Sequence, residues 1–584
     1  MAFDGIVTKA ICSELQQFRF ARIDKIFQTS KNNIIIGFYH NNSNYALNIC
    51  IDPQYYRISL TTHQKENPKT APNFCMVLRK HLLGLHIKNI ITTNLERVAI
   101  IEFEGLDDAY DLISKKLIVE LMGKHCNVIL TDENNIIIDS LRHISHDENN
   151  NSEHLSRNIY PHQKYIFPTT TKLNFLECSS AEAFIKSLPE DTNIKNVSTN
   201  ISNTFNGFST SFIEESFKSL NLSTINKATL TTLYLYINNI ISNTDTLKLK
   251  FKKICVNEKN DYIIENSSSY NNLELNFFID DFYYEKETSI NFKNYRNSIL
   301  KMLLDLLKKH KKRLLNINQK LTECNNMNTY KLYGELITSN LYKLKNNKNT
   351  QSISIENYYD NNNIINIPLN PQYSISDNAK LYFKKYNKLK NTLEIVNIQK
   401  RETIEELNYI ESIIYELENS TTIQEIAEIF EEISENVIFR EKIDKYKKNK
   451  NTKIKKSNLT KNKLVSFNPL KFTIENYTLL VGRNNKENDY LTLKYAKKTD
   501  LWFHTKDIHG SHAILQIKPN EKPNNELLIQ CAQIVAYYSK ARYSSNVPVD
   551  MCEVKYVKKP NGAKPGMVIY TNNITFNVLP KKSM

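Results

Sequence analysis

The chain is poor in glycine and lacks the segments that mark membrane or secreted proteins. Glycine supplies 11 of 584 residues, which excludes collagen-like and glycine-rich linker architectures. No apolar run approaches the roughly 18 residues of a membrane helix, and residues 1–5 do not resemble a secretory signal. The nine cysteines are dispersed without a C-x-x-C pair, so we expect free thiols in a reducing cytoplasm.

Catalytic signatures are also lacking. The chain has no P-loop and no G-x-G-x-x-G, H-E-x-x-H or G-x-S-x-G motif. His504, His509 and His512 lie close together, but their spacing matches no usual zinc pattern. We therefore expect no metal, no cofactor and no enzymatic activity.

The chain carries an excess of positive charge. Lysine and arginine number 77 against 62 acidic residues, a net charge of +15, which makes a polyanionic partner plausible. Residues 441–463 hold ten lysines against two acids and carry about half of this excess. Such a basic linker is usually solvated, but it can also bind phosphates without sequence preference.

Hydrophobic periodicity predicts a multidomain α+β protein that begins with a mixed α/β domain over residues 1–170. Apolar spacing indicates one helix over 6–20, and Pro72 and Gly84 bound a second over 72–84. The other apolar runs are short and separated by turn residues, which indicates a sheet of hairpins. The strands are expected at 34–39, 45–49, 56–60, 97–103, 116–121, 126–130 and 136–138.

Residues 171–283 change to short helices with polar breaks. The sequence Phe-Asn-Gly-Phe-Ser at 205–209 lies between two of them, and a glycine in such a turn is typical of a helix–hairpin–helix motif. The amides of this turn can face a phosphate. An ordinary turn between two helices is the alternative that the motif alone leaves open.

Residues 284–440 predict a long antiparallel coiled coil. Leucines recur every seven residues in a first helical stretch over 284–345, and a similar seam runs through a second stretch over 376–438. Two isoleucine-rich runs around an asparagine-rich turn predict a β-hairpin within 351–369. Since the faces away from the seams are polar, a coiled coil is favoured over two helices packed within one globular domain. The leucines of the first seam are Leu300, Leu307, Leu314 and Leu321.

Residues 464–584 predict a C-terminal α/β domain with a helix over about 524–543. Its segment 501–512 contains the single tryptophan of the chain among histidines and a lysine. Such side chains can stack on bases and neutralise phosphate, so we expect Trp502, His504 and Lys506 on or beside an RNA-contacting surface. A core tryptophan next to a turn is the alternative. The strands are expected at 471–474, 477–481, 513–517, 551–557, 566–570 and 574–578.

Glu96 and Arg97 precede a strand of the first domain. An arginine can bind acceptors on base edges, and a glutamate can accept from base amino groups, so the pair could read nucleobases. An ordinary charged turn at the surface is the alternative.

Taken together, nine segments resemble the NFACT family, and the resemblance covers essentially the whole chain in order. They are 1–10 (MAFDGIVTKA), 73–82 (NFCMVLRKHL), 120–125 (ELMGKH), 205–209 (FNGFS), 333–342 (YGELITSNLY), 378–390 (NAKLYFKKYNKLK), 491–494 (LTLK), 500–506 (DLWFHTK) and 559–566 (KPNGAKPG). The resemblance implies an N-terminal domain similar to those of DNA glycosylases, a helix–hairpin–helix region, a coiled-coil middle and a C-terminal RNA-binding domain.

The resemblance also implies a function in ribosome-associated quality control in the cytoplasm. Such a factor binds the large ribosomal subunit with its stranded peptidyl-tRNA, recruits alanyl-tRNA and directs extension of the nascent chain without mRNA. The alanine tail then marks the chain for degradation. Bond formation is left to the peptidyl-transferase centre, and a small RNA-binding helper protein of the same pathway is an expected partner.

Two groups of site residues are expected, the first from the resemblance and the second from the basic clusters on the two predicted coiled-coil helices. The family pattern has aspartate where this chain has Glu96, so the acidic side chain is longer here by one methylene. The expected tRNA-binding residues are Glu96, Arg97, Arg79, Lys80, Lys124 and His125. The expected ribosome-binding residues are Lys308, Lys309, Lys311, Lys312, Arg313, Lys384, Lys385 and Lys388.

Two other functions are weighed against this one. A fibronectin-binding surface adhesin is disfavoured because a secretory signal, an anchor motif and disulfides are not recognised in the sequence. A nucleic-acid enzyme of glycosylase type is disfavoured because position 2 is Ala2, whereas the glycosylases that this domain resembles use an N-terminal proline as nucleophile.

Overall fold

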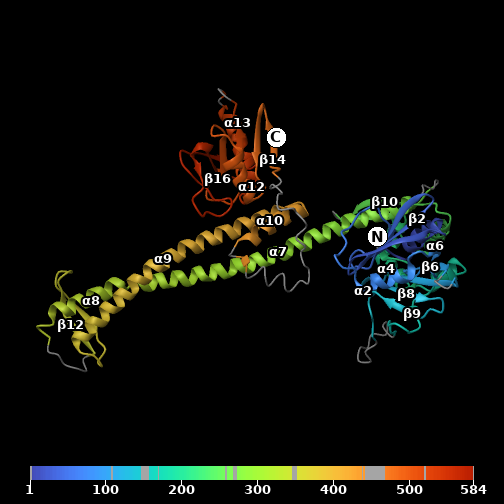
Figure 1. Ribbon diagram of the computed structural model, residues 1–584, viewed down its shortest axis with the longest axis horizontal. Helices are drawn as coiled ribbons and strands as arrows, with labels where there is room; N and C mark the ends of the chain where they lie inside the picture. The colour runs from blue at the N-terminus through green and yellow to red at the C-terminus, as the bar shows by residue number, and fades with distance from the viewer. Residues whose placement is uncertain are drawn as a thin grey trace. The chain divides into compact units, whose positions relative to one another are not determined.

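The chain forms two compact units in the computed structural model, residues 1–290 and residues 291–584 (Figure 1). The basic linker expected over 441–463 lies outside the described residues, and among the described residues no helix is long and apolar enough to cross a membrane. The structure describes residues 3–106, 110–145, 157–168, 170–256, 259–267, 273–344, 351–436, 439–440, 467–518, 521 and 523–582.

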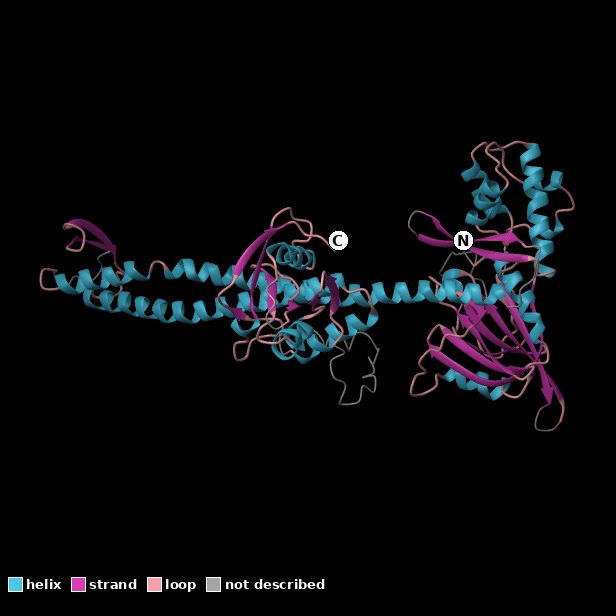
Figure 2. Ribbon diagram, turned by 90° about the horizontal axis from the view of Figure 1, so that it is seen from above, coloured by secondary structure: helices cyan, strands magenta, loops and turns pink. Residues whose placement is uncertain are grey.

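The first unit is built on a nine-stranded antiparallel sheet with the order β4-β3-β2-β1-β5-β6-β7-β8-β9 (Figure 2). Strands that follow one another in sequence mostly pair as hairpins. Asn41 and Asn42, between β2 and β3, have φ of 47° and 59°, as a tight hairpin turn requires. The strands are β1 (Arg22–Ser30), β2 (Asn33–His40), β3 (Ser43–Cys50), β4 (Arg57–Leu60), β5 (His86–Thr92), β6 (Val98–Leu106), β7 (Leu112–Glu120), β8 (Asn127–Asp132) and β9 (Ile137–Ser140).

All seven strands predicted for this domain are present, but β1 and β5 escape prediction. These two strands lie next to each other and join the two halves of the sheet. Their pairing is brief: Arg22 faces His86, and the Ile87 N–H donates to the Ala21 carbonyl at 2.9 Å. Because charged residues such as Asp24 interrupt the apolar positions of β1, its sequence lacks the short apolar run that marks the other strands.

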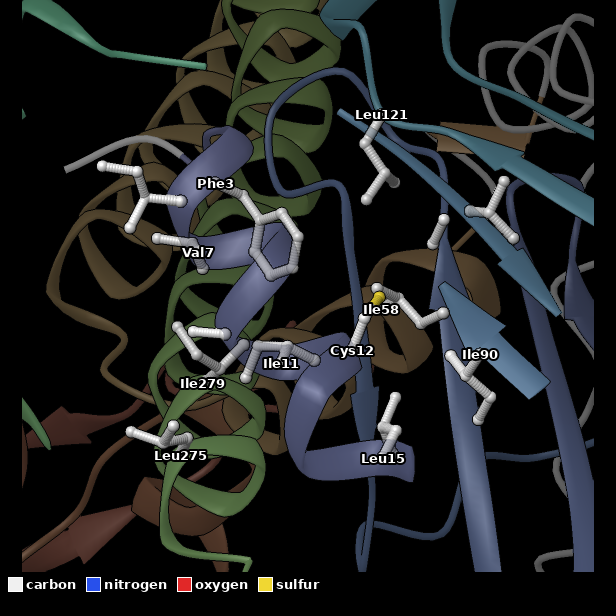
Figure 3. Packing of buried hydrophobic residues seen from close by; sticks show 14 of the residues in the cluster. Phe3, Val7, Ile11, Cys12, Leu15, Ile58, Ile90, Leu121, Leu275 and Ile279 are labelled. Atoms are coloured by element: carbon white, nitrogen blue, oxygen red, sulfur yellow. The ribbon is translucent and has the colours of Figure 1, made fainter. Parts of the chain in front are cut away.

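Helix α1 (Gly5–Leu15) forms the centre of the first unit. In Figure 3 its apolar side chains lie between the sheet, represented by Ile58 and Ile90, and the first turns of α7, represented by Leu275 and Ile279. Nine of the eleven residues of α1 are buried. The beginning of the long helix α7 is therefore part of the N-terminal core. The second predicted helix is α2 (Asn73–Leu82).

The helical region of the first unit surrounds the turn at 205–209, which links α4 to α5. The hairpin of β10 and β11 was not predicted, since its sequence mixes lysines and asparagines with the apolar residues. The elements are η3 (Phe175–Glu177), α3 (Ala181–Lys186), α4 (Ile194–Thr204), α5 (Thr210–Ser219), α6 (Lys227–Asp245), β10 (Leu249–Val256) and β11 (Lys259–Asn266).

Long helices α7 and α9 dominate the second unit and run antiparallel (Figures 1 and 2). His310 of α7 faces Glu406 of α9, whereas Cys324 further along α7 contacts the Leu389 carbonyl. α7 begins at Glu274, ten residues before the predicted start, because its first turns pack in the N-terminal core. The elements are α7 (Glu274–Cys324), α8 (Met327–Asn340), β12 (Ser352–Asn357), β13 (Asn363–Pro368), α9 (Ile375–Asn419) and α10 (Ile423–Glu435), and β12 pairs with β13 as a hairpin.

The C-terminal domain is a six-stranded antiparallel sheet with the order β14-β15-β17-β16-β18-β21, packed on α13 (Asn525–Tyr537). The central strand β16 was not predicted, because its aromatic and histidine residues were interpreted as a binding segment. The strands are β14 (Leu470–Ile474), β15 (Tyr477–Val481), β16 (Leu501–Thr505), β17 (Ala513–Gln516), β18 (Val547–Glu553) and β21 (Ile574–Val578).

Candidate nucleic-acid interface

Glu96 and Arg97 lie in the loop that enters β6, at one end of the N-terminal sheet. Val98, at the start of β6, pairs with Glu120, the last residue of β7. The Leu121 N–H donates to the Arg97 carbonyl at 2.8 Å, so the segment after β7 begins beside this loop. That segment leads into the turn η2 (Gly123–His125), in which Lys124 and His125 are exposed. The structure thus brings four of the six predicted tRNA-binding residues to one end of the sheet.

Arg79 is held by contacts with β1, whereas Lys80 is exposed. The Arg79 Nε donates to the Ile26 carbonyl of β1 at 2.8 Å, and its guanidinium lies over the Phe27 ring. Next to them His81 has a pKa lowered by burial and by the charges of Lys115 and Lys80. Lys115 lies five residues from the Glu120 end of β7, about 17 Å along an extended strand. Arg79 therefore has a structural partner in β1.

The turn at 205–209 packs directly against the loop of Glu96. The Asn206 Nδ2 donates to the Glu96 Oε1 at 2.7 Å, which joins two motifs 110 residues apart. Leu95, just before Glu96, has a φ of 57° and is 1% exposed. A Cβ atom at Gly207 would come within 2.7 Å of the Leu95 Cβ, so only glycine permits this approach.

Asp4 ties the turn to the start of α1. Its carboxylate caps the helix by accepting from the Val7 N–H at 3.1 Å, and it also accepts from the Ser209 hydroxyl at 2.8 Å and the Ser209 N–H at 3.2 Å. The Gly5 N–H donates to the Gly207 carbonyl at 3.0 Å. Two elements distant in sequence therefore hold the turn beside the loop of Glu96.

Two of the turn amides are already hydrogen-bonded within the protein. The Asn206 N–H donates to the Leu173 carbonyl at 3.0 Å, and the Ser209 N–H donates to Asp4. Because both amides are used inside the fold, they are not directed at a ligand. The turn also brings the side chain of Asn206 to the loop of Glu96.

Burial and neighbouring positive charges shift the pKa values of the two acids Glu96 and Asp4 in opposite directions. Burial raises the pKa of Glu96, and the positive charges of Arg97 and Lys172 oppose that rise. Burial also raises the pKa of Asp4 to about 6, although its hydrogen bonds and Arg97 lower it. The pKa of Lys172 is lowered by burial and by Arg97. Two acids, Glu96 and Asp4, and two cations, Arg97 and Lys172, therefore meet in a partly dehydrated site, where electrostatic interactions are stronger than in water.

Sequence reasoning missed Asp4, Lys172 and Asn206 as members of this site. The only signal was the rare glycine in Phe-Asn-Gly-Phe-Ser, which indicated a tight turn but not the loop that it packs against. The Glu96–Asn206 contact links segments that no local pattern relates.

The C-terminal residues divide between core and surface. Trp502 is fully buried in the central strand β16, beside the rings of His504 and Tyr570. A ring without exposed surface does not stack on a base, so the core alternative is correct for Trp502. His504 is half-buried, and burial lowers its pKa to about 4, whereas Lys506 is exposed. Among the described residues, no group of three potential ligands is placed to hold a metal ion.

The basic residues of the coiled coil form two clusters. Lys308, Lys309 and Lys312 are exposed on α7 opposite the Glu406 region of α9, while Lys384, Lys385 and Lys388 lie about twenty residues earlier on α9. That separation is roughly 30 Å along the helix. The two remaining residues face acids across the coil: Lys311 lies 3.3 Å from Glu411, and Arg313 lies 3.3 Å from Glu406.

Family models match nearly the whole chain. Residues 4–452 match the NFACT N-terminal and middle domains, and residues 463–572 match the NFACT protein RNA binding domain. Together with the two α/β domains and the coiled coil, these matches define a multidomain RNA-binding protein. The chain belongs to the NFACT family.

Two bacterial relatives are similar along nearly their full length. The Rqc2 homolog RqcH of Bacillus subtilis (strain 168) is 34% identical, with 99% of this chain and 98% of the relative covered. The Rqc2 homolog RqcH of Streptococcus suis (strain 05ZYH33) is 30% identical, with 99% and 98% covered. A solved structure, the C-terminal part of the fibronectin/fibrinogen-binding protein from Streptococcus suis, is 30% identical, covers 50% of this chain and 96% of its own, and has a TM-score of 0.37.

Proposed function

We propose that this protein is a ribosome-associated quality-control factor that directs alanine tailing. It binds the large ribosomal subunit that holds a stranded peptidyl-tRNA and recruits alanyl-tRNA. The nascent chain is extended without mRNA, and its tail marks it for degradation. The ribosome joins the amino acids, while this protein holds the two tRNAs in place, which is a proximity effect.

The group at the end of the N-terminal sheet is the observation that carries the proposal. Arg97 supplies donors for base or phosphate acceptors, and Glu96 accepts from base amino groups. Lys124 and His125 are exposed on the adjoining turn and provide donors for the sugar–phosphate backbone. Single-stranded RNA such as a tRNA loop presents base edges and phosphates of this kind to a protein surface.

The coiled coil and the C-terminal domain complete the proposed assignment. The exposed lysines of the coil contact ribosomal RNA phosphates, since Lys308, Lys309 and Lys312 point to solvent. The C-terminal domain matches an RNA-binding family model and presents Lys506 to solvent. A small RNA-binding protein of the same pathway binds the complex in the cytoplasm.

The test is to isolate the tagged full-length protein from lysate after ultraviolet crosslinking and to sequence its bound RNA. Large-subunit rRNA together with tRNA, enriched for alanine acceptors, is the expected result. Recovery without RNA would overturn the proposal. If the same preparation bound immobilised fibronectin, that result would support the adhesin alternative.

A further inference from the structure

We propose that Asn206 is a positioning residue that holds the Glu96 carboxylate ready for RNA. The helix–hairpin–helix turn then serves the interface as a support for the acidic side chain of the recognition pair. This inference rests on the proposed role of Glu96 in contacting tRNA, and it concerns a residue that acts through Glu96.

The geometry of the contact is specific. The Asn206 amide donates from Nδ2 to one oxygen of the Glu96 carboxylate at 2.7 Å, a short hydrogen bond to a charged acceptor. A carboxylate has two oxygens and about four lone-pair positions, so the contact leaves capacity for a ligand. Asn206 therefore restricts the orientation of the Glu96 carboxylate and leaves lone pairs that can accept hydrogen bonds from a ligand.

Asn206 is itself held on the side away from Glu96. It is 8% exposed, its N–H donates to the Leu173 carbonyl at 3.0 Å, and the Thr170 hydroxyl donates to its Oδ1 at 3.1 Å. An ionised carboxylate only accepts, so the amide turns its NH₂ to Glu96 and its oxygen to Thr170. The donor is thus oriented from both sides.

The backbone that precedes Glu96 is fixed by the same turn. Leu95 has a φ of 57°, a conformation that leucine adopts only when its surroundings impose it. Gly207 and Gly5 both approach the Leu95 carbonyl so closely that a Cβ on either would clash. Backbone and side chain of the loop are therefore set in the folded protein, which reduces the ordering that RNA binding must impose.

A double-mutant cycle in the full-length protein tests the inference. The affinity for a fluorescent transcript of an alanine tRNA is measured for the parent, Asn206→Ala, Glu96→Ala and the double variant. We expect Asn206→Ala to weaken binding about tenfold in the parent and to have little further effect once Glu96 is alanine. A residue that only stabilises the domain would lower the melting temperature and give independent, multiplying losses of affinity.

Two more variants keep the test decisive. Thr170→Ala removes the group that orients the Asn206 amide, and because Thr170 is exposed the fold should tolerate it. It should weaken tRNA binding less than Asn206→Ala, and not at all when Glu96 is alanine. Asn174→Ala is the matched control: Asn174 caps η3 in the same region and should leave affinity unchanged.

The outcomes separate this inference from the proposed function. If Glu96→Ala binds tRNA and makes tails normally, the proposed function of the pair is wrong. If Glu96→Ala loses binding but Asn206→Ala and Thr170→Ala do not, or if their losses multiply with that of Glu96→Ala, the positioning role is wrong while the proposed function stands.

Discussion

Glu14 of α1 caps the first turn of α7, 262 residues further along the chain. Its Oε2 accepts from the Asn276 N–H at 2.8 Å and from the Asn276 side-chain amide at 2.7 Å, and its Oε1 accepts from the Leu275 N–H at 3.3 Å. A carboxylate at this place satisfies helix amides that have no partner within the helix and interacts favourably with the helix dipole. The first turn of α7, the helix that enters the coiled coil, is therefore held in place by α1.

We expect Glu14→Ala to destabilise the N-terminal unit by about 2–3 kcal/mol, because buried amide donors lose their acceptor. Unfolding should be followed by circular dichroism and by tryptophan fluorescence. The single tryptophan lies in the C-terminal domain, so its fluorescence transition serves as an internal control and should not move. An unchanged dichroism transition would contradict the capping role.

Asp4 should make stability depend on pH. Burial raises its pKa to about 6, so the folded state holds a proton that the unfolded chain releases near pH 4. Its contribution to stability is complete below pH 4 and is lost as the pH rises through 6, on the order of 2–3 kcal/mol. Asp4→Asn keeps a capping side chain and should flatten this decline in urea unfolding between pH 4 and 7. Parallel curves for the parent and the variant would argue against it.

Arg97→Ala and Glu96→Ala should each abolish tail synthesis while leaving large-subunit binding largely intact. Loss of one base-reading contact costs about 1–3 kcal/mol, roughly ten- to a hundredfold in affinity. Tail length and cosedimentation with the subunit are the two measurements. Arg79→Ala is a useful comparison, since Arg79 is bound to β1 and should affect stability rather than tails. Normal tails from Arg97→Ala would refute the assignment.

Ribosome affinity should fall steeply with salt and depend on the exposed lysines of α7. Replacing Lys308, Lys309 and Lys312 with alanine should lower the slope of log affinity against log salt by up to about three. The matched variant Lys311→Ala/Arg313→Ala should change it less, because these residues already face Glu411 and Glu406. Equal slopes for all three proteins would exclude an electrostatic role for this cluster.

Trp502→Ala should act through stability. A fully buried tryptophan replaced by alanine costs about 3–5 kcal/mol, which calorimetry would detect as a lower melting temperature of the C-terminal domain. RNA binding measured well below that temperature should be retained. His504→Ala should cost less, since His504 is only half-buried. A variant of Trp502 that melts normally but loses RNA would restore a direct contact.

Local patterns predicted much of the fold, and they failed for strands whose apolar runs are interrupted or whose residues suggest another role. The heptads of α7 and the asparagine turns of the hairpins act within a few residues, so the sequence shows them directly. β1 pairs mainly with β2, and β5 pairs mainly with β6, so both belong to local hairpins. They were missed because polar residues such as Asp24 and Lys88 interrupt their apolar runs. β16 was missed because its Trp502 belongs to an interior layer that the chemistry of the residue alone does not reveal.

The candidate site, too, could be predicted from local sequence only in part. Glu96 and Arg97 could be proposed from chemistry and from the family resemblance, because charged side chains of this kind suit base edges wherever they are exposed. That Arg79 is occupied by β1 and that Asn206 holds Glu96 depended on which distant segments meet. The sequence by itself determined the helical seams, the hairpins, the excess of positive charge and the family. Only the tertiary structure decided which charged side chains are free for RNA, because long-range packing chooses the partners of each buried polar group and local sequence does not encode them.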